Sequence, residues 1–196
     1  MTETRTRIQD VQRRAAQQEI ETVALALFLE RGYAETTVDD VAAAAGVSRR
    51  TVFRYFETKE DLVLASMQEA GGRLAQAIRD LPASVTAWDA ITQTLLAFAD
   101  ELEGDAHGRP RGRLLLKTPA LHAALSHKHL QWRELVTDAA LPRVRGASAT
   151  RRLRAEGQVA SALACLDVAA TAWARADDGP TIRSRLKTVL QAVGSS

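Results

Sequence analysis

Apolar residues recur along most of this chain at spacings of three and four, the period of an amphipathic helix, and no segment of useful length alternates with the two-residue period of a strand. Glycines, prolines and Ser/Thr residues suited to helix caps divide the pattern into successive helices, with Gly32 ending the first helix and Thr58 capping the fourth. The sequence therefore predicts an all-α fold. The predicted helices cover residues 11–31, 38–45, 48–56, 59–81, 84–103, 111–117, 120–141, 150–176 and 180–193.

Two segments are predicted to be irregular, and one helix carries a weak point. Residues 1–10 are predicted to form a flexible arm, and GDAHGRPRGR at 104–113 has the composition of a loop. Within the long helix 59–81, the pair Gly71-Gly72 lowers the helix propensity. That pair predicts a hinge or a close contact with another element.

The most informative segment is TVDDVAAAAGVSRRTVFRYFETKEDL, at residues 37–62. A short helix from Val38 to Ala45 is followed by Gly46, and Ser48 then opens a second helix. Gly46 suits the turn because a positive φ penalises any residue that carries a Cβ. Apolar residues fall where two crossed helices need contacts: Val41, Ala45, Val47, Val52 and Phe56. This spacing predicts a helix-turn-helix.

The outward face of the second helix carries side chains that hydrogen-bond to phosphates and to base edges. They are Arg49, Arg50, Thr51, Arg54 and Tyr55. Residues 48–56 contain three Arg and no acid. Such a charge run often forms only a solvated helix face, but its position on the second helix of a helix-turn-helix favours contact with DNA.

Together with its flanks, this segment resembles the DNA-binding domain of the tetracycline-repressor-like (TetR) family of bacterial regulators. The matching motifs are FLERGYAETTVDDVA, AGVS and TVFRYFETKEDL. Arg50 stands where the family usually has Gly, which suggests a different base preference, and Phe53 replaces a Tyr whose hydroxyl often touches phosphate. The helix face and the resemblance together predict a set of DNA-contacting residues: Thr37, Ser48, Arg49, Arg50, Thr51, Phe53, Arg54, Tyr55 and Lys59.

The resemblance also implies the organisation and function of the whole chain. We expect a helix-turn-helix DNA-binding domain at residues 1–57 and a helical ligand-binding and dimerisation domain at 58–196. The implied protein is a cytoplasmic, ligand-responsive repressor that binds a palindromic double-stranded DNA operator as a homodimer. The last two helices would pair across a two-fold axis, with Leu186, Val189 and Val193 near the interface.

A small apolar effector, of which an acyl-CoA-like molecule is one candidate, would release such a repressor. The long connecting helix would act as the lever between effector and DNA. The candidate rests on a likeness of RLLLKTPAL, at 113–121, to TetR-family members associated with such ligands. The alternative function is a DNA-architectural or chromosome-organising protein without an inducer, which would occupy many sites.

Inward-facing residues of the second domain predict an apolar cavity for the effector. Its expected lining is Leu95, Phe98, Leu102, Trp132, Cys165, Ala169 and Trp173. His122, Arg113 and Arg109 would lie at its mouth and orient a mostly hydrophobic ligand, including an anionic one. Alternatively, the aromatic side chains pack on each other and leave no void. The arginine-rich segment 142–154 is either an exposed loop and helix start or an anion site shared with Arg109, Arg111 and Arg113.

Charge and hydropathy narrow the choice of partners. The formal net charge is +2, and residues 1–68 carry nine Lys/Arg against eleven Asp/Glu, so DNA contact depends on where the charges lie rather than on their sum. No apolar stretch approaches the roughly 20 residues that span a bilayer. The N-terminal residues lack the apolar core of a signal peptide. We therefore expect a cytosolic protein without a membrane partner.

Catalytic and metal chemistry find little support in the sequence. Cys165 is the single cysteine, which excludes an intrachain disulfide, and its Ala-rich surroundings favour buried packing over a redox-sensing thiol. None of the four histidines has a second histidine four residues away, so a metal site is not expected. The chain has no nucleophile–base pair, phosphate loop or cofactor motif, and we expect neither an enzyme nor a bound cofactor.

Overall fold

The computed structural model describes residues 2–194 and contains, over that range, ten α-helices and one short 3-10 helix but no strand. The all-α prediction is therefore confirmed. The helices form two compact units, Met1–Ser66 and Met67–Ser196. The domain boundary expected from the sequence, between residues 57 and 58, lies nine residues before the boundary between these two units.

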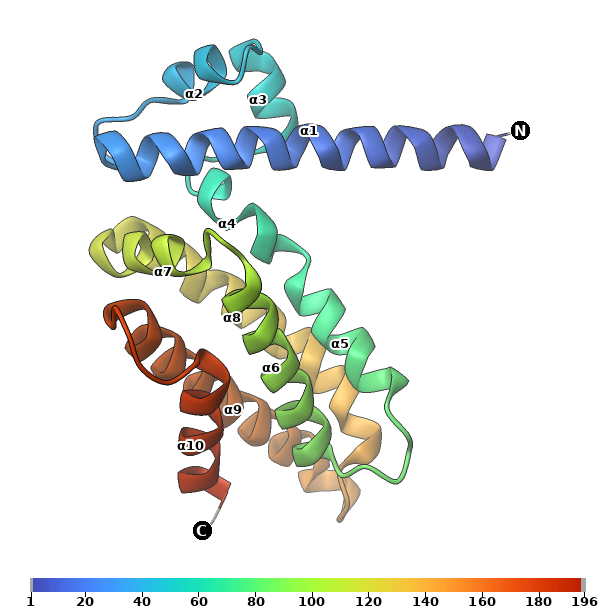
Figure 1. Cartoon of the computed structure of the whole chain (residues 1–196). Coiled ribbons are helices and arrows are strands. Elements are labelled where there is room, and N and C mark those ends of the chain that lie inside the picture. Colours follow the sequence, from blue (N-terminus) through green and yellow to red (C-terminus); the bar gives the residue numbers. More distant parts are fainter. Residues whose placement is uncertain (1, 195–196) are drawn as a thin grey trace. The chain divides into compact units, whose positions relative to one another are not determined.

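The first unit is built around α1 (Thr2–Arg31), with α2 (Val38–Ala44) and α3 (Arg49–Tyr55) on one side of it (Figure 1). α1 packs against α2, and α2 against α3. Of the apolar contacts predicted for the helix-turn-helix, Val41, Val52 and Phe56 are buried, whereas Ala45 and Val47 are half-buried. α1 buries Ile20, Ala24 and Phe28.

α1 begins at Thr2, so helix replaces the irregular arm that was predicted before residue 11. Residues 2–19 contain no Gly or Pro and are rich in Arg, Gln, Glu and Ala, which have high helix propensity. The other end agrees with the prediction. Gly32 has φ +93°, and its amide donates to the Phe28 carbonyl at 3.1 Å, which ends the helix.

The connector predicted as one helix over 59–81 is two helices, α4 (Asp61–Gln68) and α5 (Ala70–Asp80), with the break at Glu69. The Thr58 cap is confirmed: the Asp61 amide donates to Thr58 Oγ1 at 3.1 Å. Leu62–Leu64 of α4 are buried but do not belong to the core of the second unit. α5 supplies several residues of that core, and the half-buried Met67 near the end of α4 packs against it.

Gly71 makes the close contact that its sequence context predicted as one of two possibilities. A Cβ added at Gly71 would lie 2.4 Å from Cδ1 of Trp132, whereas one added at Gly72 would meet nothing within 4 Å. The absent side chain at Gly71 therefore lets α5 approach the helix that carries Trp132.

The second unit contains α6 (Ala87–Gly104), α7 (Gly108–Lys117), α8 (Pro119–Ala140), the 3-10 helix η1 (Leu141–Arg143), α9 (Ser148–Arg175) and α10 (Ile182–Gly194). α5 packs on α8, α8 on α9, and α10 on both α9 and α6. These contacts enclose one continuous apolar core. Leu186 belongs to that core and is fully buried, so it does not face outward as its predicted place at a dimer interface requires.

α7 covers six of the ten residues predicted as a loop over 104–113. Pro110 lies in its first turn, where a missing amide hydrogen costs no helical bond. The arginines of α7 fix the helix in place. Arg109 donates to the Ala176 carbonyl at 2.8 Å, and Arg113 Nε donates to the Ala174 carbonyl at 2.9 Å, so both satisfy groups at the end of α9.

Arg111, the middle arginine of α7, is 4% exposed and is paired with Asp105 at 2.6 Å. Burial by itself would raise the pKa of Asp105, but hydrogen bonds from the His107 amide and from the Arg111 guanidinium outweigh it, so the pKa is lowered. The arginines that the sequence offered as part of an anion site therefore hold α7 to its neighbours.

Candidate DNA-binding site and regulatory core

The turn between α2 and α3 has the geometry that its glycine predicts. Gly46 has φ +66°. Its amide donates to the Ala43 carbonyl at 3.2 Å, and the Val47 amide donates to the Ala42 carbonyl at 2.9 Å. These two bonds form a Schellman motif, which ends α2 and directs the chain into α3.

Hydroxyl groups cap the start of both helices. Thr37 and Asp40 form a reciprocal capping box, in which the Asp40 amide donates to Thr37 Oγ1 and the Thr37 amide donates to Asp40 at 2.7 Å. The Thr37 bonds lower the pKa of Asp40. Ser48 Oγ accepts from the Thr51 amide at 3.1 Å. Three of the predicted DNA contacts (Thr37, Ser48 and Thr51) therefore also stabilise the motif itself.

The three arginines of α3 lie in different environments. Arg49 forms an ion pair with Asp39 of α2 at 2.8 Å, and its guanidinium lies 5.4 Å from the centre of the Phe53 ring. Arg54 donates to the Tyr55 hydroxyl at 3.1 Å, and its guanidinium lies 4.8 Å from the centre of the Tyr55 ring. Arg50 is exposed and makes no hydrogen bond or ion pair with the part of the chain that the structure describes.

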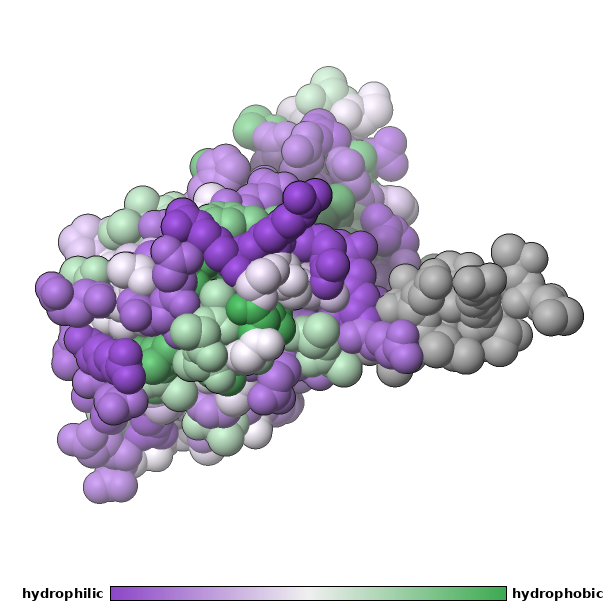
Figure 2. All heavy atoms as spheres, turned by 90° about the horizontal axis from the view of Figure 1, so that it is seen from above, coloured by the Kyte–Doolittle hydropathy of each residue, from purple (hydrophilic) through white to green (hydrophobic). Residues whose placement is uncertain are grey.

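The α2–α3 face therefore presents one unpaired guanidinium together with two that are held by neighbours. Phe53 is 43% exposed on the same face. Figure 2 looks onto this side of the first unit and shows mainly hydrophilic side chains with hydrophobic ones between them. Such a surface can place cations against phosphates and base edges while an aromatic ring contacts the sugar or thymine methyl groups.

Lys59 has its ammonium group turned toward α1. Its Nζ donates to the Tyr33 carbonyl and lies 4.2 Å from the Tyr33 ring centre and 5.6 Å from that of Phe28. Burial lowers its pKa, and Glu60 and Glu35 oppose that change. These contacts tie the residues just before α4 to the end of α1. An ammonium has three N–H donors, and contact of Lys59 with phosphate stays a prediction.

The residues predicted to line an effector cavity come together in the second unit. Six of the seven are buried in its core, and Leu102 packs against them. The Phe98 and Trp132 rings meet edge to face at 5.7 Å, so at least these two aromatic side chains pack on each other. Phe98 also lines a 360 Å³ groove between α5 and α6, at whose edge Arg73 and Glu101 form an ion pair at 3.5 Å.

Two features of this core concern its polar atoms. The indole nitrogen of Trp173 is buried and has no hydrogen-bond partner among the described residues, which is uncommon for a buried donor. Cys165 is 3% exposed, as expected, and burial raises the pKa of its thiol. Of the residues placed at the cavity mouth, Arg109 and Arg113 bind the end of α9, and His122 is exposed on α8.

Some contacts could not be read from the sequence. The sequence pattern gave Asp39 no role, although an acid on the exposed face of α2 could have suggested a partner for Arg49. His129 pairs with Asp167 at 3.2 Å between α8 and α9. Within the described residues, no group of three or more His, Cys, Asp and Glu side chains could hold a metal ion, and no helix is long and apolar enough to cross a membrane.

The fold and the exposed face of α3 define a helix-turn-helix DNA-binding regulator with a separate helical unit. Family comparisons identify both parts. The profile described as bacterial regulatory proteins of the tetR family matches residues 20–66, and the one described as the MftR C-terminal domain matches residues 85–196. The chain belongs to the TetR family of transcriptional regulators.

Individual relatives agree with this assignment. The chain is 35% identical over 119 residues to a Mycobacterium tuberculosis protein, MftR, whose name provisionally assigns it to the transcriptional regulation of mycofactocin biosynthesis. It is 35% identical over 107 residues to the regulator TcmR of Streptomyces glaucescens. These matches cover 60% and 51% of this chain, and 60% and 47% of the relatives.

Solved structures with the same fold include two FadR proteins. Thermus thermophilus FadR, in complex with lauroyl-CoA, has a TM-score of 0.61 at 22% identity, over 90% of this chain and 92% of that one. Bacillus subtilis FadR, in complex with stearoyl-CoA, has a TM-score of 0.61 at 20% identity, over 90% and 96%. At these identities the likeness establishes the fold alone.

Proposed function

We propose that this protein is a ligand-responsive repressor that binds a palindromic operator as a homodimer and leaves it when an apolar, acyl-CoA-like effector occupies the second unit. The observation that carries the proposal is Arg50, an exposed guanidinium without a partner among the described residues, on the second helix of a helix-turn-helix. A cation in that position is available for base edges in the major groove.

The division of labour on α3 follows from the contacts of each arginine. Arg50 is free to form a bidentate pair with guanine, which contributes about 1–3 kcal/mol of discrimination. Arg49 and Arg54 keep their neighbours, Asp39 and Tyr55, until phosphates compete for them. We therefore expect Arg50 to set sequence preference and the other two to set affinity.

Homodimerisation is supported by the outer faces of α9 and α10. Small or apolar residues at helical spacing form an exposed stripe along α9, namely Gly157, Ser161, Ala164 and Val168. Val193 of α10 is 46% exposed. Small side chains let two helices approach closely, and a two-fold dimer places two α3 helices on the halves of a palindrome.

An effector in the core of the second unit is supported by the Trp173 indole N–H. This buried donor has no partner in the described part of the chain, and a ligand carbonyl in the core would provide one. The two FadR structures hold acyl-CoA molecules, whose thioesters carry such a carbonyl. The match to the MftR C-terminal domain, together with the name of the Mycobacterium tuberculosis relative, favours genes of mycofactocin biosynthesis as the regulated targets.

The proposal is tested by DNase footprinting and fluorescence anisotropy on DNA upstream of the protein's own gene and of mycofactocin genes. We expect two protected half-sites one helical turn or slightly more apart, and release on addition of lauroyl-CoA but not of coenzyme A alone. Trp173→Phe should keep operator affinity and weaken release, whereas Trp88→Phe, the same change outside the predicted effector lining, serves as a matched control. Binding at many unrelated sites without release by any acyl-CoA would favour the architectural alternative.

A further inference from the structure

Phe53 is a large apolar side chain on a helix face that otherwise carries cations. Its exposed fraction is 43%, and it is the one exposed apolar residue of α3, every residue of which the structure describes. A scattered exposed hydrophobic side chain is ordinary on a protein surface, so its significance depends on its neighbours. Here the neighbours are the arginines proposed to contact DNA.

The helical period places Phe53 beside the first two arginines of α3. Residues three and four positions apart lie on one face of a helix, with Cβ atoms about 5–6 Å apart, so Phe53 is next to Arg50 and Arg49. The Arg49 guanidinium lies 5.4 Å from the centre of the Phe53 ring. This cation–π contact steadies the ring and leaves much of it exposed. DNA that Arg50 reads therefore meets the Phe53 ring as well.

The chemistry of the ring limits what it can recognise. A phenyl ring has no hydrogen-bond donor or acceptor for phosphate, unlike the tyrosine that the family usually has at this position. Base edges in the major groove present donors and acceptors, and the C5-methyl of thymine is the apolar group among them. The sugars offer apolar atoms too, but contact with them carries no sequence information. Because Phe53 shares a face with Arg50, which is proposed to reach base edges, the methyl is the group that the ring meets.

We infer that Phe53 recognises the C5-methyl of one thymine in each operator half-site, within about two base pairs of the base that Arg50 contacts. That distance follows because successive base pairs lie about 3.4 Å apart, against about 5–6 Å between the two Cβ atoms. The inference rests on the proposed function, because it needs α3 in the major groove. It adds a second specificity-determining residue, which recognises an apolar feature of the base.

The same chemistry extends to methylated DNA. 5-Methylcytosine carries its methyl group on the same ring carbon as thymine, so it presents the methyl at the same place in the major groove. A cytosine at the Phe53 position should therefore be bound more tightly when it is methylated.

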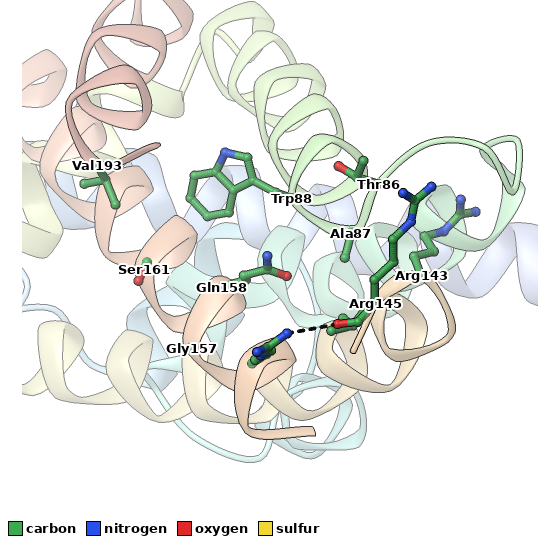
Figure 3. A pocket seen from close by; sticks show the side chains of 11 residues that line it. Thr86, Ala87, Trp88, Arg143, Arg145, Gly157, Gln158, Ser161 and Val193 are labelled. Carbon is green, nitrogen blue, oxygen red and sulfur yellow. Dashed lines mark hydrogen bonds between the residues drawn. The ribbon is translucent and has the colours of Figure 1, made fainter. Parts of the chain in front are cut away.

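The proposed homodimer makes the methyl contact twice. The faces proposed for dimerisation border a hollow of about 560 Å³, and its lining includes Gly157, Ser161 and Val193 (Figure 3). A hollow at such a face is suited to side chains of a second copy, and a dimer brings two α3 helices to the DNA. Burial of one methyl corresponds to a factor of about four in a binding constant, so two half-sites together correspond to about 15-fold.

The test is fluorescence anisotropy of the full chain with the operator selected from a randomised pool. Each thymine is replaced in turn, in both half-sites, by deoxyuridine, which lacks only the C5-methyl. We expect one position to show a loss of about 15-fold, near the base pair whose preference Arg50→Ala abolishes. At that position, 5-methylcytosine paired with guanine should bind more tightly than cytosine paired with guanine.

Three variants separate methyl recognition from other effects. Phe53→Ala should bind the thymine and deoxyuridine operators equally. Leu29→Ala is the matched control, because it removes a 44% exposed apolar side chain of α1 outside the predicted DNA contacts, and it should keep the full ratio. Arg54→Ala should weaken binding to both operators and leave their ratio unchanged. Thermal unfolding of each variant establishes that it is folded.

Three results would overturn the inference: no thymine whose loss exceeds that of its neighbours, a loss that persists in Phe53→Ala, or methylated cytosine bound no better than cytosine. A uniform loss of affinity in Phe53→Ala without any methyl effect would overturn it too, because the ring would then contact the sugars. Failure to select any operator would instead refute the proposed function, so the two failures are distinguishable.

Discussion

Replacing Asp39 by Asn should strengthen DNA binding, because it frees Arg49 from an intramolecular ion pair. The Arg49 guanidinium and the Asp39 carboxylate are 2.8 Å apart, and their side chains are 62% and 61% exposed. Water competes for both groups, so an exposed pair contributes only about 0.2–1 kcal/mol. DNA contact through Arg49 requires that pair to open. Its removal should raise the affinity by about 1.4- to 5-fold.

The assay is fluorescence anisotropy with a labelled operator duplex at several salt concentrations. Arg49 neutralises the same phosphate in both proteins, so the slope of log K against log salt should change by much less than the value of about 0.9 that one additional phosphate contact would give. Glu57→Gln is the matched control, since it removes one negative charge from an exposed position just after α3 and leaves the Arg49–Asp39 pair intact.

Asp39→Asn should exceed Glu57→Gln in affinity at each salt concentration, and the excess should vanish when Arg49 is replaced by Ala. Equal gains from the two substitutions would refute the reasoning, because they would mean that only the net charge of the unit matters. A gain that persists without Arg49 would refute it as well.

Three further predictions concern the second unit. Gly71→Ala should lower the free energy of unfolding by about 1–3 kcal/mol through its clash with Trp132, while Gly72→Ala should raise it by about 0.4–1 kcal/mol; chemical denaturation measures both. Cys165 should react with thiol reagents only after unfolding, since it is buried and its raised pKa keeps the thiol neutral; rapid labelling of the native protein would contradict this. Asp105→Asn should destabilise the unit by about 2 kcal/mol or more at neutral pH, because a buried arginine loses its charged partner. Since the folded-state pKa of Asp105 is lowered, the carboxylate's contribution is lost as pH falls through that value, and the difference should shrink in acid.

Local chemistry explains why the helix-turn-helix could be predicted from sequence. The turn at Gly46 and the caps at Thr37 and Ser48 each depend on residues within a few positions, so their geometry follows from short-range rules. The same rules predicted the helix ends at Gly32 and the cap at Thr58.

Long-range contacts explain what the sequence could not supply. The Arg109 and Arg113 bonds that hold α7 as a helix reach carbonyls more than 60 residues away, so composition alone indicated a loop. The break at Glu69 lies between Leu62–Leu64, which are buried outside the core of the second unit, and the α5 residues that belong to that core, and periodicity does not reveal this division. The apolar pattern correctly predicted which residues of the second unit share a core. It could not show that the Trp173 indole N–H has no partner among the described residues, because that depends on how the helices pack.

The central claim is that α3 reads DNA sequence through Arg50. It is tested most directly by selecting bound duplexes from a randomised pool with the unchanged protein and with Arg50→Ala, followed by sequencing. We predict a palindromic motif for the unchanged protein, and for the variant the loss of preference at one or two base pairs per half-site, at a cost of about 1–3 kcal/mol in affinity for the selected operator. An identical motif with identical affinity from both proteins would contradict the claim and would move sequence recognition to another residue.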